Sequence, residues 1–177
     1  GKTTQMAIAM QDHGLIVAAD RSLYRLQLVR ENASRLHLHS IRPVVQDARA
    51  WGAGKFARVL ADVPCSGTGI LGRHPDARWR KRAAQLSGLA GLQYSILQQA
   101  FGRLHSGGVL VYSTCSLEKE ENEGLIERFL SANGTAVLEP ASDYFPGKIW
   151  AGRYIQTLPG RDPGDGGFAA RIRKRIP

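Results

Sequence analysis

The sequence predicts an α/β fold in which a mainly parallel sheet carries helices on both faces. Apolar runs of strand length alternate with segments of helical period along nearly the whole chain. Such alternation is typical of crossover units between parallel strands. Polar or reactive side chains follow four of the apolar runs, which is where ligands bind in sheets of this kind. With 177 residues, the chain is long enough for one domain with a substantial core.

The expected elements follow from the apolar periodicity. Strands are expected at residues 15–20, 41–45, 58–63, 109–115, 135–138 and 168–176. Helices are expected at residues 3–11, 21–36, 83–104 and 118–132. Gly107 and Gly108 are expected to end the third helix, and Ser116 is expected to cap the fourth. Residues 64–80 and 140–166 are rich in Gly and Pro and are expected to be loop or irregular.

The composition favours a soluble protein with a polyanionic partner. The chain has 24 Lys and Arg against 15 Asp and Glu, a net charge of +9, which suits nucleic acid binding but is also compatible with simple solubility. The sequence contains neither an apolar run of the ~20 residues that a membrane span needs nor a signal peptide pattern. Two cysteines do not make a disulfide framework, so a cytoplasmic location is expected.

Four reactive side chains fall at or just beyond the ends of expected strands: Asp20, Asp47, Asp62 and Cys115. Each acid alone is equally compatible with a role in a turn or cap. Together they predict a ligand site at one edge of the sheet. Asp20 is placed to bind the ribose hydroxyls of a nucleoside cofactor, and Asp47 to accept from the amino group of an adenine.

The first residues, Gly1-Lys2-Thr3, also suit the end of a phosphate-binding P-loop. In that alternative Asp62 would hold magnesium, and the protein would be an ATPase or GTPase. Pro64-Cys65, directly after Asp62, argues against it, because phosphoryl transfer does not need a cysteine there. The opening residues are those of an interrupted glycine-containing loop, so the chain is expected to be truncated at its N-terminus.

The cysteines, Cys65 in DVPCSGTG and Cys115 in VYSTCS, admit four interpretations. A disulfide does not suit a cytoplasmic protein. A zinc site needs about four ligands, but neither cysteine has a CxxC partner, and no metal is expected. Inert buried thiols are the commonest case. A nucleophile needs nearby positive charge, which the loop supplies through Arg73, Arg78, Arg80, Lys81 and Arg82.

One reaction would use a cysteine, a carboxylate and an adenosine-containing cofactor together. Carbon-5 of cytosine is a poor nucleophile until a thiolate adds at C6, which makes C5 enamine-like and able to attack an electrophilic methyl group. A carboxyl group near N3 stabilises the adduct. A base treated in this way must be unstacked or flipped out to be reached.

The motifs DVPCSGTG, HPDARWR, YSTCSLEKEENE and GDGGFAARIRK resemble those of the Sun/Nop family of RNA cytosine-5 methyltransferases, close to the bacterial small-subunit rRNA enzymes. GKTTQMA resembles the end of that family's PGGKT cofactor loop. The match runs from Gly1 to about Lys174. It implies a Rossmann-like methyltransferase fold, one catalytic domain over residues 1–177, S-adenosylmethionine as cofactor and RNA, expected to be 16S rRNA, as substrate.

The resemblance also implies roles for individual residues. Cys115 matches the nucleophile, Cys65 matches the cysteine that assists release of the product, and Asp62 also faces the base. The cofactor positions are Gly1, Lys2, Asp20, Arg25, Asp47 and Asp62. RNA binding is expected at Arg73, His74, Arg78, Trp79 and Arg80, with the C-terminal RIRKR strand.

The chain departs from the family pattern in two respects. The strand and most of the glycine loop expected before Gly1 are absent, as is the family's N-terminal RNA-binding region. Gly167-Phe168-Ala169 stands where a second aromatic residue is common. Three alternatives stay open beside the methyltransferase: a P-loop NTPase, a DNA cytosine-5 methyltransferase with Cys65 as nucleophile, and an inactive RNA-binding fragment.

Overall fold

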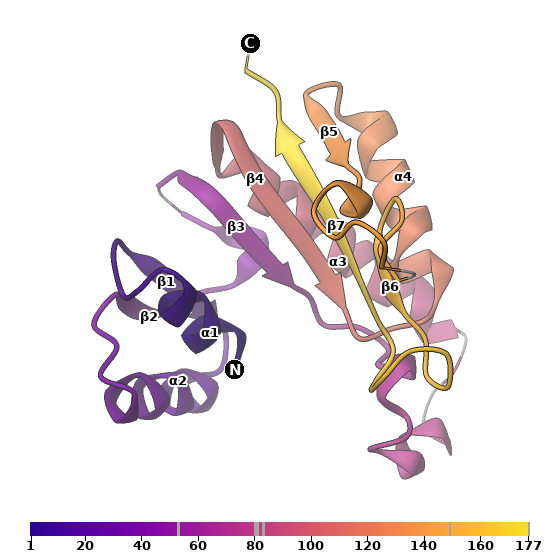
Figure 1. Ribbon diagram of the computed structural model, residues 1–177, viewed down its shortest axis with the longest axis horizontal. Coiled ribbons are helices and arrows are strands. Elements are labelled where there is room, and N and C mark those ends of the chain that lie inside the picture. Colours follow the sequence, from indigo (N-terminus) through magenta and orange to yellow (C-terminus); the bar gives the residue numbers. More distant parts are fainter. Residues whose placement is uncertain (53, 80–81, 83, 149, 177) are drawn as a thin grey trace. The chain divides into compact units, whose positions relative to one another are not determined.

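The computed structural model describes residues 1–52, 54–79, 82, 84–148 and 150–176. It divides into two compact units, Gly1–Gly52 (unit 1) and Ala53–Pro177 (unit 2) (Figure 1). Helices pack on strands in both units, so the expected α/β class is confirmed. The expectation of one catalytic domain stays a prediction.

Unit 1 is built on two parallel strands. Its elements are α1 (Lys2–Ala9), β1 (Ile16–Asp20), α2 (Leu23–Arg35), β2 (Ile41–Val45) and a 3₁₀ helix, η1 (Ala48–Ala50). Ile16 lies opposite Ile41, and Asp20 lies opposite Val45. The buried core is small, with Ala7, Ala33 and Ile41 at its centre. Since this one cluster joins α1, α2 and the strands, both helices cover the same face of the strand pair.

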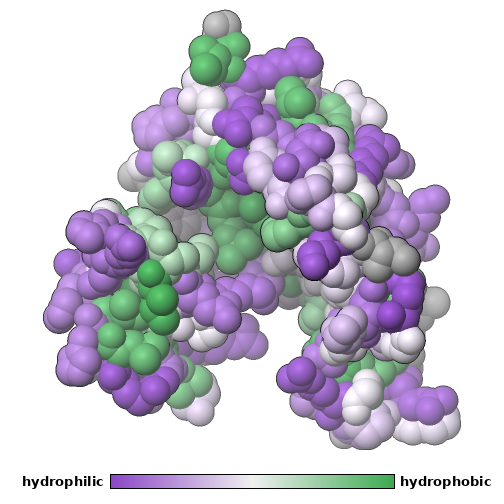
Figure 2. All heavy atoms as spheres, viewed as in Figure 1, coloured by the Kyte–Doolittle hydropathy of each residue, from purple (hydrophilic) through white to green (hydrophobic). Residues whose placement is uncertain are grey.

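Some large apolar side chains of unit 1 are exposed at its surface. Ile8 and Leu15 are 55% and 61% exposed, and Figure 2 shows apolar side chains over α1.

Asp12, just after α1, accepts hydrogen bonds at 2.7 and 2.8 Å from the backbone N–H groups of His39 and Ser40. The bonds from Ser40 and His39 lower the pKa of Asp12 to about 2. A single half-buried carboxylate therefore ties the end of α1 to the start of β2.

Unit 2 contains a mixed sheet. Its strands are β3 (Phe56–Asp62), β4 (Leu104–Thr114), β5 (Ala136–Glu139), β6 (Ile155–Thr157) and β7 (Gly167–Lys174). The order is β3-β4-β7-β5, with β6 also paired to β7. β3 and β4 are parallel, whereas β7 runs antiparallel to β4, β5 and β6. The direction of β7 differs from the expected mainly parallel sheet. The chain reaches β7 from β6 through a loop without a crossover helix, and such connections join antiparallel strands.

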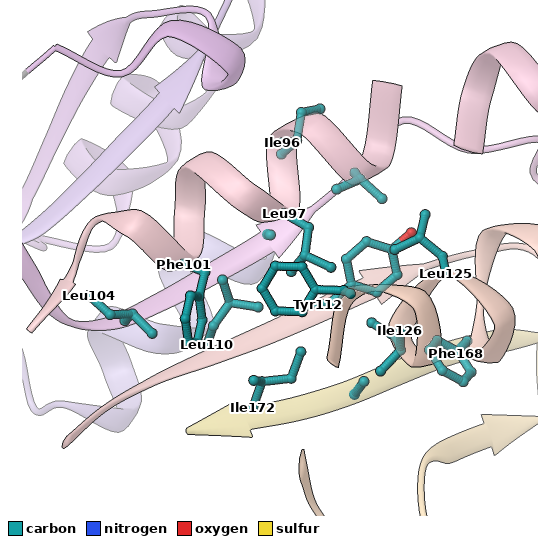
Figure 3. Close-up of a cluster of buried hydrophobic side chains, with 14 residues drawn as sticks. Ile96, Leu97, Phe101, Leu104, Leu110, Tyr112, Leu125, Ile126, Phe168 and Ile172 are labelled. Carbon is teal, nitrogen blue, oxygen red and sulfur yellow. The ribbon is translucent and has the colours of Figure 1, made fainter. Parts of the chain in front are cut away.

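The helices of unit 2 share one face of this sheet. They are α3 (Ala84–Gly102) and α4 (Glu123–Ala132), with 3₁₀ helices η2 (Thr68–Ile70), η3 (Pro75–Trp79), η4 (Lys119–Glu121) and η5 (Ala141–Asp143). Phe129 of α4 packs edge-on against Phe101 of α3, with ring centroids 5.2 Å apart. Both helices bury Leu110 and Tyr112 of β4 (Figure 3). Among the described residues, the helices therefore cover one face of the strands within each unit, and neither unit by itself shows the expected helices on both faces.

Three local expectations are corrected. Gly107 and Gly108 do not end α3, which stops at Gly102, but lie inside β4. They form an irregularity there, since the pairing jumps from Leu104 to Val109 and Gly107 has a φ of +76°. The segment 140–166 contains the short strand β6, which was not expected. The last helix starts with the 3₁₀ turn η4, and α4 itself begins at Glu123.

Within the described ranges, the helices are too short or too polar for a membrane crossing.

Candidate active site

The two cysteines come together at the ends of neighbouring strands. β3 and β4 are parallel, with Asp62 opposite Ser113, so the loops that follow them emerge side by side. Cys65 Sγ and Cys115 Sγ lie 3.2 Å apart without a disulfide. The Cys115 N–H donates to Cys65 Sγ at 3.3 Å. Because the two sulfurs are farther apart than the ~2.05 Å of a disulfide bond, both thiols are free in this structure, and both are half-buried.

The contact changes the acidity of the Cys65 thiol. The hydrogen bond with Cys115 and the burial of the side chain raise the pKa of Cys65 above its usual range. The Cys115 N–H acts in the opposite direction but is the weaker influence. The raised pKa favours the protonated form of Cys65 while Cys115 lies beside it.

Asp62 is the last residue of β3 and lies three positions before Cys65. Its Oδ1 accepts a hydrogen bond of 2.9 Å from the Ser113 hydroxyl of β4. The carboxylate is exposed at the strand end. The sequence placed Asp62 and Cys115 at the ends of strands, and the structure confirms that placement; their roles stay predictions.

A buried polar network lies behind the cysteines. Glu121 of η4 is 0% exposed and receives the Ser66 N–H at 2.8 Å and the Gln93 side-chain amide at 2.7 Å on Oε1. The hydroxyls of Ser66 and Ser116 both donate to Oε2. Gln93 also donates to the Pro64 carbonyl at 2.9 Å. Sequence analysis missed these residues, since Glu121 is one of several acids in EKEENE and only its burial distinguishes it.

A third loop, which contains Gly166, contacts the two cysteine loops through backbone hydrogen bonds of glycines. The Gly69 N–H donates to the Cys115 carbonyl, and the Gly166 N–H donates to the Gly69 carbonyl, both at 2.9 Å. A Cβ on Gly69 would lie 2.3 Å from the Gly166 carbonyl oxygen. The GDGG motif is therefore in backbone contact with the cysteine loops, and this approach is open only to glycine at position 69.

In unit 1, Asp20 ends β1 and Arg25 lies in the first turns of α2. Asp20 Oδ1 accepts from the Ser22 N–H at 2.8 Å, and Oδ2 lies 3.6 Å from an Arg25 guanidinium nitrogen. Gly1 caps α1 and Lys2 opens it. The strand-end position expected for Asp20 is confirmed, and so is a local turn role.

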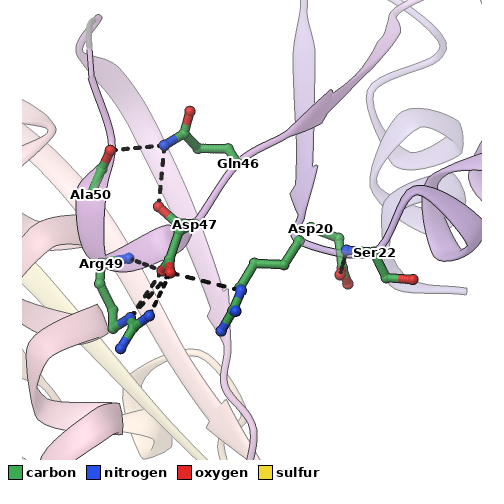
Figure 4. Close-up of polar contacts among 7 residues, drawn as sticks. Asp20, Ser22, Gln46, Asp47, Arg49 and Ala50 are labelled. Atoms are coloured by element: carbon green, nitrogen blue, oxygen red, sulfur yellow. Dashed lines mark hydrogen bonds and ion pairs between the residues drawn. The ribbon is translucent and has the colours of Figure 1, made fainter.

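Asp47 lies two residues beyond β2 and caps η1. Arg49 binds both of its oxygens, at 2.7–3.2 Å, and Arg21 lies 3.7 Å away (Figure 4). The side-chain and backbone hydrogen bonds from Arg49 hold the pKa of Asp47 well below its usual range. The carboxylate is thus already engaged by an arginine on the surface of unit 1.

The residues expected to bind RNA are partly engaged within the protein. Arg73 is ion-paired to Asp165 at 2.6 Å. His74 lies on the loop between η2 and η3, beside an exposed pair in which the Arg78 guanidinium stacks over the Trp79 ring at 4.9 Å. Trp79 is 81% exposed. Arg80 lies outside the described residues.

The basic residues of the C-terminal strand have structural partners. Arg171 and Arg173 of β7 both bind the carboxylate of Glu139 on β5. The ammonium of Lys174 donates to backbone carbonyls of Phe101 and Leu104. These three side chains have partners within the protein, and the expectation that this strand meets RNA phosphates stays a prediction.

Other candidate sites are poorly supported. Among the described residues no cluster of His, Cys, Asp and Glu suits a metal ion. A depression of about 420 Å³ in unit 1, lined by Arg30, His37 and His39 among others, contains none of the predicted site residues.

The α/β fold is that of S-adenosylmethionine-dependent methyltransferases. The crystal structure of NSun6 from Pyrococcus horikoshii with SFG matches with a TM-score of 0.85 and 32% identity, covering 100% of this chain and 46% of that one. A methyltransferase homologue from the same organism matches with a TM-score of 0.81 and 30% identity, covering 98% of this chain and 58% of that one.

The family model described as 16S rRNA methyltransferase RsmB/F matches residues 1–173, and the chain belongs to this family. This confirms the resemblance to the Sun/Nop enzymes. Ribosomal RNA small subunit methyltransferase B of Yersinia pseudotuberculosis is 42% identical over 99% of this chain and 40% of its own length. The chain thus spans about 40% of the length of the curated relatives it matches.

Proposed function

We propose that the protein carrying this chain transfers a methyl group from S-adenosylmethionine to carbon-5 of a cytosine in RNA, with 16S rRNA as the substrate and the cytoplasm as the location. The observation that carries the proposal is the 3.2 Å contact between two thiols that end parallel strands. Membership of the RsmB/F family supports the same reaction. A single buried thiol would fit an inert cysteine, but two touching thiols at the carboxyl edge of a sheet fit a two-step covalent reaction.

Cys115 is the nucleophile in this proposal. Its thiolate forms a bond to C6, and the electrons of the C5–C6 double bond move toward C5. Because Cys65 holds its proton in the resting pair, it can donate to the Cys115 sulfur and stabilise that thiolate. S-adenosylmethionine, when bound, supplies the methyl group that C5 takes up.

Cys65 acts in the second step. Once the Cys115 sulfur is bonded to C6 it is a weaker hydrogen-bond partner, so the chief cause of the raised Cys65 pKa, the hydrogen bond with Cys115, is weakened. Cys65 then releases its proton to solvent and its thiolate takes the C5 proton, the double bond re-forms, and the bond between C6 and Cys115 breaks, with Cys115 leaving as the thiolate. Asp62 lies on the same strand end and is exposed, as a group that binds N3 of the base must be.

The adenosine part of the cofactor is assigned to unit 1. Asp20 and Asp47 follow neighbouring parallel strands, and their carboxylates are acceptors suited to ribose hydroxyls and to an amino group. Arg25 and Arg49 hold these two acids in place. Gly1 and Lys2 complete the proposed cofactor set in unit 1, and Asp62 belongs to the cofactor prediction on sequence alone. The SFG bound by the Pyrococcus relative is an analogue of S-adenosylmethionine, which supports this choice of ligand.

RNA is assigned to the loop that precedes α3. Arg78 and Trp79 present a stacked cation and ring to the outside, the combination that stacks an unpaired base. Arg73 and His74 lie on the same segment and supply phosphate contacts. Arg80 belongs to this prediction on sequence alone.

Substitution of each cysteine tests the covalent mechanism. In the natural full-length protein, Cys115→Ala should give no methyl transfer and no adduct, since the nucleophile is lost. Cys65→Ala should accumulate methylated RNA bound to Cys115, seen as a slow band on a denaturing gel. A trapped band with Cys115→Ala alone would reverse the two roles. Full activity in both variants would reject the mechanism.

Calorimetry with two ligands tests the cofactor. S-adenosylmethionine should bind to the full-length protein, and Asp20→Ala should weaken that binding by roughly 1–3 kcal/mol, the range for hydrogen bonds to charged groups. Glu31→Ala, which removes an exposed acid from the same unit, is the control and should have no effect. Binding of magnesium-ATP without S-adenosylmethionine binding would favour the P-loop alternative instead.

A further inference from the structure

The residue after each cysteine is bound by the same carboxylate oxygen. Ser66 follows Cys65 and Ser116 follows Cys115, and both hydroxyls donate to Glu121 Oε2. The two hydroxyl oxygens lie 2.9 Å apart. Two loops separated by 50 positions in the sequence therefore meet at one atom, each through the residue that follows its cysteine.

The other oxygen of Glu121 binds the first loop a second time. Oε1 accepts the Ser66 N–H at 2.8 Å, and it shares the Gln93 amide with the Pro64 carbonyl. These bonds fix the backbone on both sides of Cys65. With four donors on two oxygens, Glu121 uses about the full accepting capacity of a carboxylate.

Glu121 is itself held from behind. Its backbone carbonyl accepts the Tyr112 hydroxyl of β4 at 2.7 Å. The neighbouring Asn122 binds the Ser116 carbonyl at 2.9 Å and the Thr114 hydroxyl at 2.6 Å. Both acceptor and support are fully buried, so this geometry is shielded from exchange with water.

We propose that Glu121 is a positioning residue that sets the distance between Cys65 and Cys115 by binding Ser66 and Ser116 together. The proposal rests on the function proposed above, in which Cys115 first bonds to the base and Cys65 then removes a proton from the same base. Glu121 does not touch the reacting atoms and acts only through the two loops.

The test compares Glu121→Gln with two controls in the full-length protein. Gln keeps the size of the side chain but has one accepting oxygen in place of two, so it can accept only about half of the four hydrogen bonds that Glu121 receives. Glu120→Gln makes the same change at the adjacent exposed position. Ile126→Val, in the buried core of α4, lowers stability without touching the network.

Two readouts separate positioning from stability. Glu121→Gln should lower kcat by about 100-fold, the scale for a misplacement near 1 Å, with KM for RNA changed less than about twofold. It should also change the ratio of the iodoacetamide alkylation rates of Cys65 and Cys115 by about tenfold. Both controls should leave kcat and the ratio unchanged at a temperature where all variants are folded.

The alkylation ratio does not depend on methyl transfer. If the wild-type protein transfers no methyl group but Glu121→Gln still changes the alkylation ratio, the positioning role is kept and the proposed function is rejected. A ratio in Glu121→Gln equal to that of Ile126→Val would overturn the positioning role, whatever happens to kcat. If Glu121→Gln does not fold, Ser66→Ala replaces it, with the same change of ratio expected from the loss of one of the two hydroxyl bonds.

Discussion

The two units handle their polar side chains in opposite ways. In unit 1 the acids Asp12, Asp20 and Asp47 lie at the surface and bind nearby backbone N–H groups or arginines. In unit 2 the polar side chains behind the cysteines, such as Glu121 and Gln93, are fully buried and bind one another. Only the second arrangement is removed from water.

The difference matches what each unit is proposed to do. An acid that binds a ribose or an amino group must be reachable and can exchange a surface arginine for the ligand at little cost. Two thiols that must remain in contact need loops whose positions do not drift, and buried, fully bonded networks provide this. The expected effects of substitutions therefore decrease from the loops of unit 2 to the surface of unit 1.

The largest effect on stability is expected at Gly69. A methyl group there would lie 2.3 Å from the Gly166 carbonyl oxygen and 2.9 Å from the Cys115 carbonyl oxygen, so two backbone segments must move. Gly69→Ala should reduce the free energy of unfolding by about 3 kcal/mol, at the upper end for overpacked sites, measured by urea denaturation. Gly72→Ala is the matched control, because nothing lies within 4 Å of its Cβ position. Equal losses in both variants would contradict the tight loop packing.

An intermediate effect is expected at Tyr112, which is 0% exposed. Tyr112→Phe removes the hydroxyl bound to the Glu121 carbonyl, at a cost of about 1–2 kcal/mol at neutral pH. Burial, followed by the charge of Glu121, raises the pKa of Tyr112 above its ordinary value of 10.0. Because the folded state keeps this proton and the unfolded state releases it, wild-type stability from this group is complete below pH 10 and declines above it.

The difference between Tyr112→Phe and wild type should consequently narrow above pH 10, since phenylalanine does not ionise. Urea midpoints on both sides of that pH measure it. Tyr24→Phe, at a site 68% exposed, should differ from wild type by little at any pH. A constant difference for Tyr112→Phe across the alkaline range would show that the hydroxyl is not buried as described.

The smallest effect is expected at Asp12 in unit 1. Asp12→Asn leaves one accepting oxygen for the two N–H groups of His39 and Ser40, so hydrogen exchange at those amides should accelerate. The pKa of Asp12 is lowered from 3.8 to about 2, so its contribution is complete above 3.8 and is lost as the pH falls toward 2. The variant and wild type should therefore converge in acid. Asp143→Asn, an exposed change in unit 2, should leave these amides unaffected.

Much of the fold follows from local pattern. The strands that begin at Ile16 and Ile41 and the helix at Leu23–Arg35 were expected within a few residues, because apolar period and polar ends agree there. The direction of β7 could not be predicted, because alternating apolar residues look the same in parallel and antiparallel strands. In sequence, the two glycines inside β4 look like the end of a helix. Only the pairing of β4 with β3 shows that they form an irregularity within a strand.

In the candidate site, too, the local features could be predicted from the sequence and the long-range contacts could not. Strand ends located Asp20, Asp62 and Cys115, since a strand end is a local feature. The burial of Glu121 depends on loops from three parts of the chain and leaves no local trace. The pairing of Arg171 and Arg173 with Glu139, 32 and 34 positions away, likewise could not be seen from a basic run of sequence.

The close approach of Gly69 and Gly166 bears on how tolerance to substitution is interpreted in this chain. In a scan of all single substitutions, these positions should reject nearly every residue, as Cys115 should, although neither glycine carries a reactive group. A tolerance map alone would then mark the glycines as chemical residues. The backbone bonds between Gly69, Cys115 and Gly166 show that at these two positions the map would report the space between three loops.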